Sequence, residues 1–133
     1  MRYEKGQTVI ISKTVDRETV EKFAELSGDY NPIHLDERFA EKSRFKKCIA
    51  HGMIGASYIS AVLGTEFPGN GTIYMEQQLK FIKPIYVGEC VTVEVEILEI
   101  LERGKAKLRT DLLNIDGEVA IKGEALVKLP ILP

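Results

Sequence analysis

An aspartate and a histidine lie five positions apart on a segment rich in turn-forming residues. Asp29 and His34 flank Asn31 and Pro32 in the stretch S-G-D-Y-N-P-I-H. Proline fixes its own φ and restricts the preceding residue to extended geometry, so the turn can direct both polar side chains toward one small molecule. A carboxylate and an imidazole that converge in this way can act as an acid/base pair. The segment is therefore a candidate catalytic loop.

The same residues also suit an ordinary turn, because Asp and Asn side chains before a proline often bond their own backbone. A second segment favours the catalytic interpretation. His51 and Gly52 directly precede an apolar run that extends to Leu63. A helix that starts there would direct unpaired N–H groups and a partial positive charge toward a bound oxygen.

The pattern F-x-x-L-S-G-D-x-N-P-I-H-x-x-x-x-x-A over residues 23–40, followed by A-H-G-M at 50–53, resembles the MaoC-like (R)-specific enoyl-CoA hydratase family. The similarity covers nearly the whole chain. It continues in P-G-x-G at 68–71, L-x-F-x-x-P at 79–84, V-G at 87–88 and G-E-A-x-V-K-L-P at 123–130. The resemblance implies a hot-dog fold and the addition of water to an enoyl thioester.

The resemblance also implies roles for three residues. The family's reaction needs a base for water, an acid for Cα and a donor for the thioester oxygen as enolate charge develops. Asp29 and His34 match the pair that binds and polarises the water and returns a proton to Cα. Which of the two handles each proton stays open. Gly52 matches the residue whose backbone N–H is the oxyanion donor.

Four further residues are expected near this site. Asn31 is expected to position the turn or a water molecule through its amide. Ser60 matches a serine near the site in related hydratases, and a helix serine bonded to a backbone carbonyl is the alternative. Leu63 lies three residues later, on the same helical face, and is expected to line the acyl pocket. His51 is expected to be structural and to bond locally.

No metal ion or cofactor is expected. Four potential ligands lie in or near the candidate loop, and their spacing matches no zinc pattern: Asp29, His34, Asp36 and His51. Ser57 lies in G-A-S-Y-I, which is not a nucleophile elbow. The sequence also contains no P-loop or dinucleotide-binding glycine motif.

The expected partner is an acyl thioester carried by CoA or by acyl carrier protein. Arg44, Lys46 and Lys47 precede the His51–Gly52 element and are candidates for contacting the phosphates of CoA or the acidic surface of a carrier protein. Solvated charges without a binding role are the alternative, since isolated surface charges usually contribute little.

Other functions share parts of this pattern. Dehydration of a 3-hydroxyacyl group on acyl carrier protein is the reverse reaction and would use the same residues. A thioesterase shares the hot-dog scaffold but needs attack of water at the carbonyl carbon, and fold analogy alone does not separate the two. A non-enzymatic module that binds acyl thioesters would need neither Asp29 nor His34.

Length and composition indicate one globular domain over residues 1–133. The chain is 44% hydrophobic and 29% charged, with a net charge of −2, which is typical of a soluble protein. The sequence suggests neither a nucleic-acid footprint nor a segment long enough to span a membrane. Two isolated cysteines and an N-terminal stretch without a secretory signal lead us to expect a reducing, cytoplasmic setting.

Periodicity predicts an α+β fold. Helices are expected at 17–27, from 36 to about 42 and at 52–63, and strands at 8–15, 72–81, 91–97, 106–112 and 119–127. The strands alternate apolar and polar residues, as in an antiparallel sheet with one face in water. That sheet must bury its other face on the apolar helix, which is the hot-dog architecture. Because one curled sheet leaves exposed edges, we expect at least a homodimer.

Overall fold

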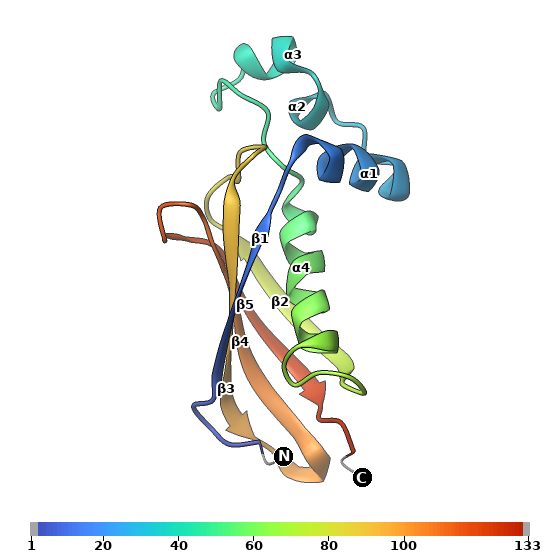
Figure 1. Cartoon of the computed structure of the whole chain (residues 1–133), viewed down its shortest axis with the longest axis vertical. Coiled ribbons are helices and arrows are strands. Elements are labelled where there is room, and N and C mark those ends of the chain that lie inside the picture. The colour runs from blue at the N-terminus through green and yellow to red at the C-terminus, as the bar shows by residue number, and fades with distance from the viewer. Residues whose placement is uncertain (1–2, 132–133) are drawn as a thin grey trace.

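One antiparallel sheet curls around one long helix in the computed structural model, which describes residues 3–131 (Figure 1). The elements follow the order β1 (Thr8–Thr14), α1 (Arg17–Ser27), α2 (Pro32–Leu35), α3 (Glu37–Glu41), α4 (Gly52–Thr65), β2 (Ile73–Phe81), β3 (Cys90–Ile100), a 3-10 turn (Glu102–Gly104), β4 (Lys105–Leu113) and β5 (Val119–Lys128).

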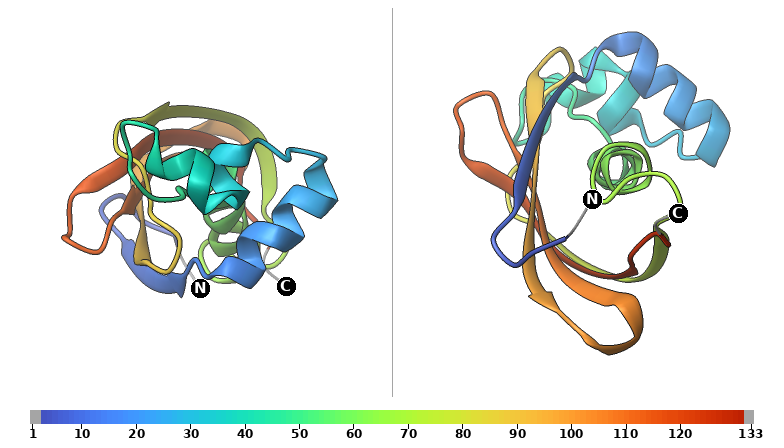
Figure 2. Two further views of the ribbon diagram at one scale, coloured as in Figure 1. Left: turned by 90° about the horizontal axis from the view of Figure 1, so that it is seen from above. Right: turned by 60° about the horizontal axis from the view of Figure 1, so that its bottom comes forward.

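The five strands are arranged in the order β1-β3-β4-β5-β2, and every neighbouring pair is antiparallel. β1 and β2 are therefore the two edges. The right-hand view of Figure 2 looks along α4 and shows the sheet curving around it. The predicted α+β hot-dog fold is confirmed.

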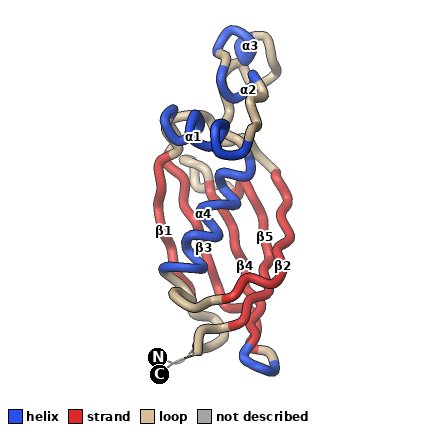
Figure 3. Tube along the Cα trace, turned by 90° about the vertical axis from the view of Figure 1, so that its right-hand side faces the viewer, coloured by secondary structure: helices blue, strands red, loops and turns tan. Residues whose placement is uncertain are grey.

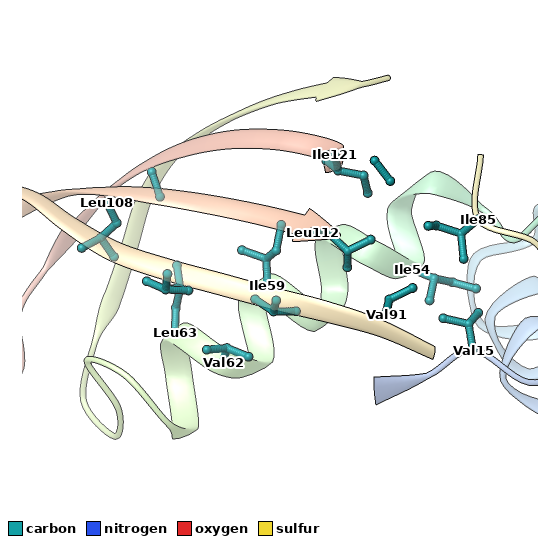
Figure 4. Packing of buried hydrophobic residues seen from close by; sticks show 14 of the residues in the cluster. Val15, Ile54, Ile59, Val62, Leu63, Ile85, Val91, Leu108, Leu112 and Ile121 are labelled. Atoms are coloured by element: carbon teal, nitrogen blue, oxygen red, sulfur yellow. The ribbon is translucent and has the colours of Figure 1, made fainter. Parts of the chain in front are cut away.

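The core lies between α4 and the concave face of the sheet. Alternate β3 residues, Val91, Val93, Val95 and Ile97, are fully buried, because strand side chains alternate between the two faces. Side chains of α4, including Ile54, Ile59 and Leu63, point into the same layer (Figure 4). Burial of this apolar area is the main contribution that holds α4 against the sheet.

Gly55 sets how closely α4 approaches the sheet. A Cβ atom at this position would lie 2.5 Å from Cδ1 of Ile121, so a larger residue would force the Ile121 side chain of β5 or the helix to shift. The opposite face of α4, with Met53, Ser57 and Ala61, is exposed in the single chain.

The short helices α1, α2 and α3 lie together at one end of the sheet, beyond the N-terminus of α4 (Figure 3). Asp16 caps α1 by accepting a hydrogen bond from the Thr19 N–H at 2.8 Å, and Gly28 ends it with a φ of 80°. A left-handed residue at the end of a helix is commonly glycine. Both predicted boundaries of α1 are confirmed.

Two boundaries differ from the prediction. α2 was expected to be only a turn, but Pro32 occupies its first position and the Asn31 side chain caps it; proline suits the first position of a helix. α4 continues past Gly64 to Thr65, and the Glu66 N–H bonds to the Val62 carbonyl. β3 contains a β-bulge, since its register with β4 shifts between Ile97 and Glu99.

Among residues 3–131, no helix is long and apolar enough to cross a membrane.

Candidate active site

Asp29 follows the C-terminus of α1, where the loop backbone holds it in place. Its N–H donates to the Ser27 hydroxyl at 3.1 Å, and its Oδ1 accepts from the Asn31 N–H at 3.2 Å. The Asn31 Oδ1 in turn accepts from the Ile33 N–H at 3.1 Å. The turn interpretation is therefore correct for Asn31. For Asp29 the turn uses one carboxylate oxygen and leaves lone pairs for a ligand.

His34 lies on α2 and is buried, with 8% of its surface exposed. Its Nδ1 is 2.7 Å from the Ile49 carbonyl. Because a carbonyl only accepts, Nδ1 carries the proton and Nε2 keeps a lone pair. The pKa of His34 is lowered overall, mainly because the ring is buried. His51 also lowers this pKa, whereas the hydrogen bond to Ile49 and the charge of Asp29 raise it. The ring is therefore neutral near pH 7 and can accept a proton.

His51 is the N-cap residue of α4 and stacks on His34, with ring centroids 3.9 Å apart and an interplanar angle of 30°. Its Nε2 donates to the Asp29 carbonyl at 2.9 Å. His51 is predicted from the sequence to be structural and to form a hydrogen bond within its own segment. The acceptor lies 22 residues away, because the start of α4 packs beneath the Asp29 loop.

Gly52 is the first residue of α4, directly after His51. The first N–H groups of a helix have no acceptor within the helix and carry partial positive charge. A Cβ atom at Gly52 would lie 2.7 Å from a Phe81 ring carbon. Only glycine therefore lets Phe81 of β2 pack against the start of α4 without a shift.

A cavity of about 440 Å³ lies at this site, and Asp29 is not among the residues that line it. His34, His51 and Gly52 line its polar end. The rest of the lining is mainly apolar. It comes from the chain before α4, from the sheet and from the loop between β2 and β3, and it includes Val15, Phe45, Ile49, Phe81, Ile82, Ile85, Val91, Leu112 and Ile121. A cavity that is mostly apolar with a few convergent polar groups is typical of a small-molecule site.

The three basic residues before α4 do not form one group. Arg44 lines the cavity. Lys47 lies over the ring of Tyr86, with its Nζ 5.1 Å from the centroid, and lines a separate surface pocket. Lys46 is exposed and has a φ of 68°. Of the three, only Arg44 lines the cavity that His34 also lines.

Ser60 and Leu63 lie farther along α4 than the cavity. Ser60 is exposed and Leu63 is buried in the core, and neither lines the cavity described above. Three residues along a helix place the two side chains about 60° apart, and in the single chain Leu63 lies in the buried stripe whereas Ser60 lies outside it. Their roles at the site stay predictions.

Sequence reasoning missed three contacts of the site. Phe23 packs on His51 with centroids 4.9 Å apart, the Ile49 carbonyl holds His34, and Phe81 covers Gly52. Phe23 is the first residue of the pattern over residues 23–40, so the sequence did contain a signal for its place at the site. A backbone carbonyl such as that of Ile49 has no signature in the sequence.

The potential metal ligands form a smaller group than expected. Asp29, His34 and His51 offer ligand atoms within 4.8 Å of one another, whereas Asp36 caps α3 through the N–H groups of Arg38 and Phe39. The absence of a metal stays a prediction.

Comparison with known proteins gives matches along nearly the whole chain. A family model described as "MaoC like domain" matches residues 3–116. The 3-hydroxybutyryl-CoA dehydratase of Methylorubrum extorquens is 46% identical over 128 residues, which are 96% of this chain and 81% of the relative. The (R)-specific enoyl-CoA hydratase of Aeromonas caviae is 44% identical over 128 residues, 96% of each chain.

A solved structure agrees with the sequence matches. The unliganded R-hydratase PhaJ1 of Pseudomonas aeruginosa has a TM-score of 0.95 and 38% identity, covering 98% of this chain and 84% of that one. The likeness extends over the sheet, α4 and the helices that hold Asp29 and His34. This chain belongs to the MaoC-like family.

Proposed function

We propose that the protein adds water to trans-2-enoyl-CoA to give (R)-3-hydroxyacyl-CoA. The observation that carries the proposal is the meeting of an Asp29 carboxylate and a neutral His34 imidazole, within 4.8 Å of each other, at the N-terminus of α4. The relatives named for hydration or dehydration of CoA thioesters support it.

In this mechanism a water molecule lies between the Asp29 carboxylate and the His34 Nε2. The pair takes one proton from the water as its oxygen bonds to Cβ, and a proton is returned to Cα. Negative charge develops meanwhile on the thioester oxygen. The Gly52 N–H donates a hydrogen bond to that oxygen, at the positive end of the α4 dipole.

A single incubation separates this reaction from its rivals. With a short enoyl-CoA, hydration removes the conjugated thioester absorbance without releasing thiol, whereas a thioesterase releases free CoA. A binding module changes neither signal. Release of thiol in step with loss of absorbance would show that the carbonyl carbon, not Cβ, is attacked.

The basic residues before α4 are proposed to contact the carrier, with Arg44 contributing most because it lines the cavity. Neutralising Arg44, Lys46 and Lys47 together should raise KM for enoyl-CoA with little change in kcat, since contacts to the non-reacting part are similar in ground and transition states. The difference in KM between the triple variant and the unmodified protein should become smaller at high salt, because salt already weakens the charged contact in the unmodified protein. Lys42→Gln, a nearby exposed lysine at the end of α3, is the matched control.

Comparing carriers decides what this loop recognises. If the triple variant is impaired equally on enoyl-CoA and on a truncated enoyl-pantetheine, the loop does not bind the CoA phosphates. A much larger loss on acyl carrier protein would favour the dehydratase alternative.

We also propose a homodimer, with the thioester groove at the subunit boundary. β2 is an edge strand, and Ile73, Met75 and Phe81 on it are each about half exposed. Apolar residues on an unpaired edge favour association. Sedimentation velocity is expected to give a dimer or a larger assembly; a stable monomer with full activity would refute this.

Leu63 is proposed to affect acyl-length preference from the core side of α4, where it is 1% exposed. The cytoplasmic setting also stays a prediction from the sequence.

A further inference from the structure

The His51 ring is held between two other rings and is almost completely buried. His34 stacks on it at 3.9 Å and Phe23 packs on it at 4.9 Å between centroids. Only 3% of His51 is exposed. The three rings come from α1, α2 and the start of α4, so the stack ties together the three elements that form the site.

Packing alone does not explain why this ring is an imidazole. Its Nδ1 is buried and has no hydrogen-bond partner among the residues that the structure describes. A buried polar atom without a partner is unfavourable, and a phenyl ring at this position would avoid that cost. What a phenyl ring cannot provide is the N–H that His51 donates to the Asp29 carbonyl at 2.9 Å.

Asp29 is exposed and lies on a loop, so a hydrogen bond from another segment is needed to fix its backbone. Its N–H is bonded to Ser27 and its carboxylate to the Asn31 N–H, both within two residues of it. Of these three hydrogen bonds to Asp29, the one from His51 joins it to a residue far away in the sequence. It joins the loop to the helix whose first residue is Gly52.

We infer that His51 is a positioning residue for the hydration reaction: its N–H fixes the Asp29 backbone and its ring face fixes His34, both relative to the Gly52 N–H. The inference rests on the proposed function. His51 is not assigned a proton of the reaction. A misplacement of about 1 Å between reacting groups can cost about 10²-fold in rate, so its loss is expected to lower kcat rather than raise KM.

The pH dependence of the reaction provides a signature of this contact. Burial is the main reason that the pKa of His34 is lowered, and His51 lowers it further in its protonated form. A residue at position 51 that cannot take up a proton should therefore raise the pKa of His34. Since neutral His34 is the reactive form, the acid limb of kcat/KM should move to higher pH.

Four other charged groups lie near His34 and stay unchanged in this test: Asp29, Arg17, Glu37 and Arg44. Asp29 raises the pKa of His34. Arg17 donates to the His34 backbone carbonyl at 3.2 Å and pairs with Glu37, and Arg44 lines the same cavity as His34.

Two variants separate the hydrogen bond from the ring contact. His51→Gln keeps an N–H near the position of Nε2 and removes the ring, whereas His51→Phe keeps the ring and removes the N–H. We expect kcat to fall about 10-fold in His51→Gln and about 10²-fold in His51→Phe, with KM changed less than about 3-fold. The acid limb of kcat/KM should move to higher pH in His51→Gln.

Val127→Ala serves as the control for lost stability. Val127 is fully buried on β5 and does not line the cavity, so its truncation should lower the melting temperature without changing kcat per folded molecule. If both His51 variants behave like Val127→Ala, with an unmoved acid limb, His51 is only a packing residue and the inference is wrong.

A measurement on the unmodified protein provides a check that does not depend on folding of the variants. The chain has two histidines, so ¹⁵N imidazole spectra are simple to assign. We expect the Nε2–H tautomer for His51 and the Nδ1–H tautomer for His34; an Nδ1–H tautomer at His51 would overturn the inference. Absence of any hydration by the unmodified protein would instead refute the proposed function.

Discussion

Replacing Asp29 by asparagine, or His34 by alanine, is expected to lower kcat for enoyl-CoA hydration by about 10²- to 10⁴-fold. The asparagine keeps the shape of the carboxylate but cannot take a proton, and the alanine lacks the Nε2 lone pair of the imidazole. The fold should persist, because neither side chain belongs to the apolar core. Stopped-flow or steady-state loss of the enoyl absorbance measures the rates, and circular dichroism checks the fold.

The double variant should be little worse than the slower single variant, because residues that act on one water molecule as a unit are strongly non-additive. Asp36→Asn is the matched control: its carboxylate lies on the same segment but caps α3 through Arg38 and Phe39, and asparagine is also a good cap. Full activity in either single variant would mean that this loop is only a turn.

The second large effect is expected at Gly52, through a comparison of two substitutions. Gly52→Pro removes the N–H, and proline is tolerated at the first position of a helix. His51 already has φ −57° and ψ 133°, which suits a residue before proline. Gly52→Ala keeps the N–H and adds the same Cβ, which meets Phe81 in both variants.

The ratio of kcat in these two variants cancels the steric effect of the added Cβ and reports the replacement of the N–H by the proline ring. We expect Gly52→Pro to be slower than Gly52→Ala by about 10²- to 10³-fold, the usual effect of removing one oxyanion donor. Equal rates in the two variants would show that the Gly52 N–H does not bind the thioester oxygen.

The order and type of most elements followed from short-range patterns in the sequence. α1 covers residues 17–27 as expected, and the alternation in Val91, Val93 and Val95 marks the buried face of β3. α2 was missed because Pro32 at a first helical position and Pro32 in a turn have the same local sequence. The end of α4 was placed early because Gly64 is not its C-cap.

The candidate site was predictable in its residues but not in its contacts. The motif placed Asp29, His34 and Gly52, and these lie at one end of α4. The stack of Phe23, His51 and His34 joins three segments that are separate in the sequence, and such tertiary contacts leave no periodic signal.

The basic loop shows the same limit of sequence reasoning. Arg44, Lys46 and Lys47 were treated as one group because their charges are close together in the sequence. Lys46 has a left-handed backbone, and Arg44 and Lys47 on its two sides line different pockets. A positive φ at a lysine is not expected from the residue type, so the division of the loop could not be predicted.

The configuration of the product tests the central claim most directly. Purified protein is incubated with crotonyl-CoA, and the 3-hydroxybutyryl product is resolved by chiral chromatography in parallel with the Asp29→Asn variant. If Asp29, His34 and Gly52 hold water and thioester in one fixed arrangement, the unmodified protein forms the (R) enantiomer alone and the variant forms almost none. Formation of the (S) enantiomer, of a racemate, or of equal product by the variant would contradict this account.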